Sequence, residues 1–247
     1  MEHQKVVFYR GCTLRNISQD AVSKIQYIFE KAGIDLVIID DEGCCGYPLL
    51  LAGYREQFRR CASSVAEKLT SVDHSLIVTH CPGCLRMFTQ LYPRNGLRSL
   101  KALHTTQFLL QLIRGGALKL EKSVDLRAAY HDPCDLGRHL GVYAEPREVV
   151  KTVPGVSLIE LPEVSVGRYS RCCGGGGLLR LVVPPLASQI AIDRIAEDVA
   201  GLDVQALITA CPTCTRTLRD AASVVESIYG ASIKVLDVVE LVYNSLV

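Results

Sequence analysis

The chain has 247 residues and a formal net charge of +1, so no excess of basic residues indicates binding to nucleic acid or to an anionic membrane. It contains no tryptophan, which weakens any interpretation based on stacking of bases. Its longest apolar runs, such as residues 181–187, are too short for a transmembrane segment, and the first ten residues lack the features of a signal peptide. We therefore expect a cytoplasmic protein.

Short β-rich runs alternate with helical patterns along the chain. Strands are expected within residues 6–12, 34–40, 75–81, 128–134, 156–162 and 206–211. Apolar residues at three-to-four spacing predict helices over residues 18–33, 54–69, 184–201 and 214–230. The first of these helices has Ser18 as a candidate N-cap and Gly33 as a candidate C′ residue. This alternation predicts βαβ units with parallel strands.

The cysteines are arranged twice in the same order. Both halves of the chain read C…CC…CPxC at nearly equal spacing, and only Cys61, expected to be a small buried hydrophobe, falls outside the pattern. We expect two similar Rossmann-like α/β lobes with small parallel sheets, related by an internal pseudo-twofold. The boundary should lie within residues 115–126, giving domains 1–118 and 119–247, with residues 103–116 as a linking helix.

This dense cysteine pattern favours metal or redox chemistry over disulfides in a reducing compartment. Four of the six cysteine groups follow predicted strands, where open α/β folds place ligand sites. A structural zinc takes four ligands, so each half would leave one of its five thiols unused. An iron–sulfur cluster can use the surplus, although the spacing differs from that of bacterial ferredoxins. Zinc in one lobe remains an alternative, as does phosphate binding by the glycine run.

The motifs CCGYP, THCPGC, HDPCDLGRH, CCGGGG and TACPTC resemble those of the cysteine-rich CCG domain family. Its best-known members are the catalytic subunits of heterodisulfide reductases, with relatives in glycolate, lactate and fumarate systems. The resemblance covers roughly residues 5–245. It implies two noncubane [4Fe-4S] clusters, one for each set of five cysteines. The first set is Cys12, Cys44, Cys45, Cys81 and Cys84, and the second is Cys134, Cys172, Cys173, Cys211 and Cys214.

Other residues near these motifs are candidates for supporting roles. Glycines without a Cβ atom allow close approach of backbone N–H groups to cluster sulfur, which marks Gly46, Gly174 and Gly175 as cofactor-binding candidates. His80 and His131 are candidate proton donors, with a purely structural role as the alternative, and no catalytic residue is assigned. Family members often have histidine at the position of Asp135, which puts any role there in doubt.

The resemblance also implies a function. The family's catalytic members reduce a disulfide, or oxidise thiols in reverse, between two noncubane clusters. We therefore expect an iron–sulfur oxidoreductase subunit acting on a disulfide or thiol substrate. Its partners would be a ferredoxin-like iron–sulfur subunit, a flavin-containing subunit, or both. The alternatives are a non-catalytic electron relay in a dehydrogenase or quinone-linked complex and, less favoured, a zinc-stabilised scaffold. Arg138 and Arg171 are candidates to balance the charge of a cluster or to receive an anionic substrate or partner, with solvation at the surface as the default interpretation of both.

Overall fold

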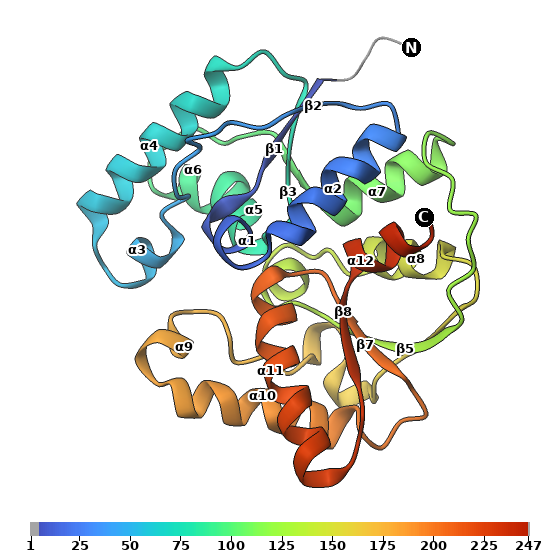
Figure 1. Ribbon diagram of the computed structural model, residues 1–247. Helices are drawn as coiled ribbons and strands as arrows, with labels where there is room; N and C mark the ends of the chain where they lie inside the picture. Colours follow the sequence, from blue (N-terminus) through green and yellow to red (C-terminus); the bar gives the residue numbers. More distant parts are fainter. Residues whose placement is uncertain (1–4, 247) are drawn as a thin grey trace. The chain divides into compact units, whose positions relative to one another are not determined.

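A computed structural model of the chain describes residues 5–246. It divides after Lys119 into two compact units, Met1–Lys119 and Leu120–Val247. Each unit contains a four-stranded sheet flanked by helices, which confirms the expectation of two Rossmann-like α/β lobes (Figure 1). Among the described residues, no helix is both long and apolar enough to cross a membrane.

The sheet of the first unit is entirely parallel and has the order β2-β1-β3-β4. The central strand β1 is buried along almost its whole length, as expected for a strand covered on both faces. Val7 of β1 pairs in register with Val37 and with Ile77 on its two sides. The strands are β1 (Lys5–Tyr9), β2 (Asp35–Val37), β3 (Leu76–Thr79) and β4 (Ala102–His104).

Aromatic side chains from neighbouring positions of β1 build the two halves of this core. Phe8 and Tyr9 point to opposite faces because side chains alternate along a strand. Phe29 lies edge-to-face with Phe8 on one face, and Phe88 does the same with Tyr9 on the other. The helices are α1 (Gly11–Ile17), α2 (Gln19–Lys31), α3 (Tyr47–Leu51), α4 (Arg55–Ser71), α5 (Pro82–Arg86), a π-helical turn (Met87–Leu91), α6 (Tyr92–Arg94) and α7 (Thr105–Arg114). In Figure 1, α2 and α7 lie on one side of the sheet and α4 and α6 on the other.

The second unit repeats this topology, with the strand order β6-β5-β7-β8 and all strands parallel. Its strands are β5 (Leu126–His131), β6 (Val156–Ile159), β7 (Ala206–Thr209) and β8 (Lys234–Asp237). Helices α10 and α11 pack against each other, as do α8 and α12. The helices are a π-helical turn (Asp135–His139), α8 (Ala144–Thr152), 3-10 turns (Glu163–Ser165 and Gly167–Tyr169), α9 (Leu179–Val182), α10 (Pro184–Asp198), α11 (Pro212–Tyr229) and α12 (Val238–Asn244).

The predicted strands and helices are present, but the sequence did not reveal the fourth strand of either sheet. Strands β4 and β8 have only three and four residues and mix apolar with polar side chains. The expected linking helix is α7, which contacts β3 and β4 and so belongs to the first unit. Gly33 has φ of 70° just after α2, as predicted, whereas the side chain of Ser18 makes no capping hydrogen bond.

Replacing Asp237 with alanine should lower the free energy of unfolding of the second unit by about 1–2 kcal/mol, measured by urea denaturation. Its carboxylate accepts the Val239 N–H at 2.9 Å and the Thr215 hydroxyl at 2.9 Å, joining α12 to α11. Ser18→Ala is the matched control, because this N-cap makes no side-chain hydrogen bond. Equal losses in both variants would contradict the role given to the Asp237 cap.

Candidate metal centres

In both units, cysteines lie where the two central strands end. In the first unit β1 leads to Cys12 and β3 leads to Cys81. In the second unit β5 leads to Cys134 and β7 leads to Cys211. These strands are neighbours in their sheets, and the strand order reverses direction between them. Open α/β sheets bind ligands outside the carboxyl ends of strands at such a point.

The five thiols of the first cysteine set form a continuous series. The Sγ atoms of Cys12 and Cys44 are 3.9 Å apart, and those of Cys45 and Cys84 are 3.4 Å apart. Cys45 also interacts with its neighbour Cys44, and Cys84 interacts with Cys81. All five cysteines are free thiols rather than members of disulfides. The order of the series is Cys12, Cys44, Cys45, Cys84 and Cys81.

The second unit repeats this series residue for residue. Cys172 interacts with Cys134 on one side and with Cys173 on the other. Cys214 interacts in the same way with Cys173 and Cys211. These five cysteines are also free thiols, and three of them, Cys173, Cys211 and Cys214, are buried. The structure therefore brings together each set of five that the sequence marked.

Backbone N–H groups point at the sulfur atoms of the vicinal cysteines. Gly174 donates to the Cys172 sulfur at 3.3 Å, and Gly175 donates to the Cys173 sulfur at 3.4 Å. In the first unit the N–H of Gly46 interacts in the same way with the Cys44 thiol, and the N–H of Tyr47 with the Cys45 thiol. These donors stabilise negative charge on sulfur in both units.

The thiols compete with one another for ionisation. Hydrogen bonds from Cys134 and Cys173 lower the pKa of Cys172 to about 2. The interaction with Cys172 raises the pKa of both those donors, and burial raises it further. One thiolate is thus stabilised at the expense of its neighbours. Five thiolates side by side repel one another, so a bound cation favours their joint ionisation, and a thiol that binds a metal does so as the thiolate.

Two glycines of the second motif, Gly174 and Gly175, are also required by packing. A Cβ atom on Gly174, whose φ is 77°, would lie 2.3 Å from the carbonyl oxygen of Ala187 in α10. A Cβ atom on Gly175 would lie 2.3 Å from the hydroxyl of Thr217 in α11. The two helices therefore press against the loop that carries the vicinal pair. Gly46 has the same constraint in the first unit, where a Cβ atom would lie 2.9 Å from the ring of Phe58.

The donor set fits a polynuclear iron–sulfur group in each unit. Each unit offers five free thiols in one series, two of them buried in the first unit and three in the second, with N–H groups directed at sulfur, and cysteine thiolates are the ligands of iron–sulfur clusters. A single zinc ion would leave one thiol of each series outside its tetrahedron. A smaller group of possible ligands, His131, Cys173 and Cys214, has ligand atoms within 4.8 Å of one another.

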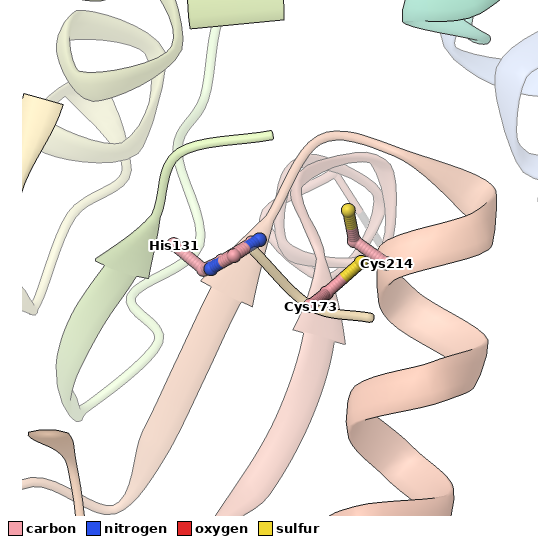
Figure 2. Close-up of side chains that lie close together, drawn as sticks. All are labelled: His131, Cys173 and Cys214. Atoms are coloured by element: carbon pink, nitrogen blue, oxygen red, sulfur yellow. The ribbon is translucent and has the colours of Figure 1, made fainter. Parts of the chain in front are cut away.

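The two candidate histidines have different surroundings. His80 is fully buried, and its ring lies 5.3 Å from that of His104, which hydrogen-bonds the His80 carbonyl oxygen at 3.0 Å. His131 is fully buried at the end of β5, and its ring points toward the sulfur atoms of Cys173 and Cys214 (Figure 2). Burial, together with the charge of Arg194, lowers the pKa of His131 to about 3, so the ring is neutral at neutral pH.

The two candidate arginines bind other groups of the protein. Arg138 is exposed and donates to the Ser170 carbonyl oxygen at 2.6 Å. Arg171 is half-buried and pairs with Glu197 at 2.6 Å and with Asp198 at 3.2 Å. Arg138 is thus a surface residue, as expected, that also binds the backbone, whereas Arg171 takes part in a network of ion pairs. Cys61 is half-buried on α4 rather than buried as expected.

Sequence reasoning missed a buried carboxylate in the first unit that ties the vicinal-cysteine loop to a strand end. Glu42 lies two residues before Cys44 and accepts the N–H groups of Arg10 at 3.1 Å and Gly11 at 2.8 Å. It is only 1% exposed. The signal that could have found it is an acidic residue directly before the GCCG motif.

In the second unit the carboxylate lies on the strand side instead. Asp132, just after β5, accepts the N–H of Gly167 at 2.8 Å and two hydrogen bonds from Arg147 at 2.6 and 2.8 Å. Both units therefore join the strand end to the loop by a hydrogen bond from a backbone N–H to a buried carboxylate. The carboxylate belongs to the loop in the first unit and to the strand end in the second.

Comparisons with known proteins agree with the repeat. The family profile described as "Cysteine-rich domain" (CCG) matches residues 6–89 and 128–219. The chain is also similar to a protein of Methanosarcina acetivorans that is named as one of the subunits of dihydromethanophenazine:CoB–CoM heterodisulfide reductase. The two are 33% identical over 98% of this chain, which spans 59% of that protein.

Two other relatives carry different names. One, from Methanothermobacter marburgensis, is named as one of the subunits of fumarate reductase (CoM/CoB), and it is 29% identical over 96% of the chain and 45% of that protein. The other is EtfAB:quinone oxidoreductase of Syntrophomonas wolfei, which is 29% identical over 89% of the chain and 31% of that protein. The chain thus spans about half, or less, of the length of these two proteins.

The glycine run offers a test of the packing around the second series. Gly175→Ala should displace the loop, because its Cβ would overlap the Thr217 hydroxyl, and so reduce metal binding by the second unit to a small fraction. Gly176→Ala is the matched control, since a Cβ there would meet nothing within 4 Å. Metal and acid-labile sulfide per chain, measured after anaerobic reconstitution, give the readout. Equal metal content in the two variants would count against the steric role of Gly175.

Proposed function

Because the chain belongs to the CCG cysteine-rich domain family, we propose that it is the iron–sulfur redox subunit of a heterodisulfide-reductase-like complex. Each unit would hold one [4Fe-4S] cluster of the noncubane type. We assign the clusters to domains 1–118 and 119–247, in a cytoplasmic protein. The proposed ligands are Cys12, Cys44, Cys45, Cys81 and Cys84 for the first cluster, and Cys134, Cys172, Cys173, Cys211 and Cys214 for the second.

The observation that carries this proposal is the repeated series of five thiols. The same five positions are joined in the same order in both units, from the cysteine after the first central strand to the CPxC pair. A protein that needed the cysteines only for packing would not require sulfur next to sulfur throughout both series. The series also supplies one ligand more than zinc would use.

Two clusters would supply the two electrons that convert one disulfide and two protons into two thiols. The chain's thiolates would bind the metal, and the N–H groups of Gly174 and Gly175 point at the sulfur atoms of Cys172 and Cys173. Such hydrogen bonds favour the reduced state and so tune the reduction potential. The name of the Methanosarcina acetivorans relative supports disulfide chemistry as the reaction class.

We propose that the chain works inside a larger assembly. Electrons must reach the two cysteine sites from a donor, and a ferredoxin-like iron–sulfur subunit or a flavin-containing subunit would provide them. Two of the three relatives are named as subunits of an enzyme, which supports an assembly of this kind. The direction of electron flow then follows from the potentials of the partners.

An electron relay is the second candidate function. The similarity to a protein named EtfAB:quinone oxidoreductase favours it, because that name describes electron transfer to a quinone rather than chemistry at sulfur. In a relay the same clusters would pass electrons between partner subunits without binding a disulfide.

Cys173→Ser should lower iron from about eight to about four atoms per chain, because it removes the central member of the second series. Cys61→Ser is the control, since this half-buried residue lies outside both series. Iron and sulfide analysis of anaerobically purified protein measures both. One or two zinc ions per chain, with no sulfide, would remove both redox functions.

Disulfide reduction and relay can be separated by rapid mixing. Chemically reduced protein is mixed with low-molecular-weight disulfides such as mixed disulfides of coenzyme thiols, and cluster oxidation is followed by absorbance. Disulfide chemistry predicts oxidation with release of two thiols per disulfide, and loss of this reaction in Cys173→Ser. A wild-type protein that transfers electrons to a quinone analogue but releases no thiol would support the relay.

A further inference from the structure

A buried histidine–arginine pair lies beside the second cysteine series. His131 ends β5 and Arg194 lies in α10, and both side chains are 0% exposed. The Nε–H of Arg194 donates to His131 Nδ1 at 3.3 Å. The other guanidinium nitrogens bind Asp198 at 2.6 Å and the Ser165 carbonyl oxygen at 3.0 Å, which fixes the orientation of the group.

This contact determines which nitrogen of His131 carries the proton. A guanidinium can only donate, so Nδ1 must present its lone pair to Arg194. The neutral ring then has its proton on Nε2. A protonated nitrogen has no lone pair for a metal ion, so His131 cannot act as a ligand through Nε2 while Arg194 holds Nδ1. This geometry excludes His131 from the metal-ligand group suggested by proximity alone.

The Nε2–H of His131 has no hydrogen-bond partner among the residues that the structure describes. The ring points toward Cys173 and Cys214, and the ligand atoms of the three residues lie within 4.8 Å of one another (Figure 2). A buried donor is rarely left unsatisfied in a native protein. A group held by the neighbouring thiols would supply the missing acceptor.

The first unit has a different residue at the equivalent position. Tyr9 pairs in register with Thr79, as His131 pairs with Thr209. The Tyr9 hydroxyl donates to the Gly43 carbonyl oxygen at 3.2 Å. The hydrogen bond that this position could offer to sulfur is thus used within the protein.

We propose that Arg194 is a positioning residue that holds His131 as an Nε2–H donor to sulfur of the cluster in the second unit, and that this cluster has the higher reduction potential of the two. The proposal rests on the proposed function, since it requires a cluster in each unit. A hydrogen bond to sulfur stabilises the more negative, reduced cluster. Electrons entering the chain therefore settle in the second unit.

The potentials test this assignment. In EPR-monitored redox titrations of cluster-loaded protein, His131→Leu should shift the midpoint of the second cluster downward and leave the first unchanged. His131→Gln keeps an amide N–H and should restore much of the shift. Arg194→Met should act like His131→Leu. Arg171→Gln is the matched control, because Arg171 also pairs with Asp198 but does not donate to His131. Unchanged midpoints in His131→Leu, or equal shifts in Arg171→Gln, would overturn the proposal.

Pulsed EPR of reduced wild-type protein, labelled with 15N-histidine, tests the contact without any variant. Donation predicts a weak nitrogen coupling together with a proton coupling that disappears in D₂O. A strong nitrogen coupling would mean direct ligation, and no exchangeable proton would mean no hydrogen bond; either result overturns the proposal. Iron and sulfide analysis of the same sample separates the two levels. If the sample contains iron and sulfide but the EPR experiment shows no hydrogen bond, only this inference is refuted. If the sample contains neither iron nor sulfide, the proposed function is refuted as well.

Discussion

The structure depends on one electrostatic constraint: five thiols share a partly buried site in each unit, and their mutual repulsion disfavours ionisation of all five unless a cation is bound. The hydrogen bonds between Cys172 and its two neighbours show the conflict, because they lower the pKa of one thiol while raising the pKa of the others. N–H groups from the CCG loops relieve part of this charge. An iron–sulfur group bound by the thiolates would relieve the rest.

The fold meets this constraint with two devices. Parallel strands bring one cysteine and one CPxC pair to the same edge of each sheet, on either side of the point where strand order reverses. A buried carboxylate then fixes the loop of the vicinal pair against the strand end, through Glu42 in the first unit and Asp132 in the second. The positions of these carboxylates differ, so the two units reached the same arrangement with different side chains.

Tyr9 and His131 are a second pair of different side chains at corresponding positions of the two units. Each residue is the last of its strand, β1 or β5, and each pairs with the last residue of the neighbouring strand, Thr79 or Thr209. The Tyr9 hydroxyl donates to the backbone and so offers no hydrogen bond to the first cysteine series. The His131 ring, fixed by Arg194, offers one more N–H donor to the second series. A duplicated site can thus hold two groups of one type at unequal potentials.

The sequence by itself determined the repeat, the two sets of five cysteines and the alternation of strands and helices, because spacing and periodicity are written along the chain. It also indicated His131 as a candidate residue, but not which of its ring nitrogens carries the proton. The short strands β4 and β8 escaped detection because their few mixed residues carry no periodic signal. Only the tertiary structure decided the order of the sulfur series, the clash that requires Gly175, and the contact between His131 and Arg194, which are 63 residues apart. These features depend on distances between segments that are remote in sequence, and no local pattern records them.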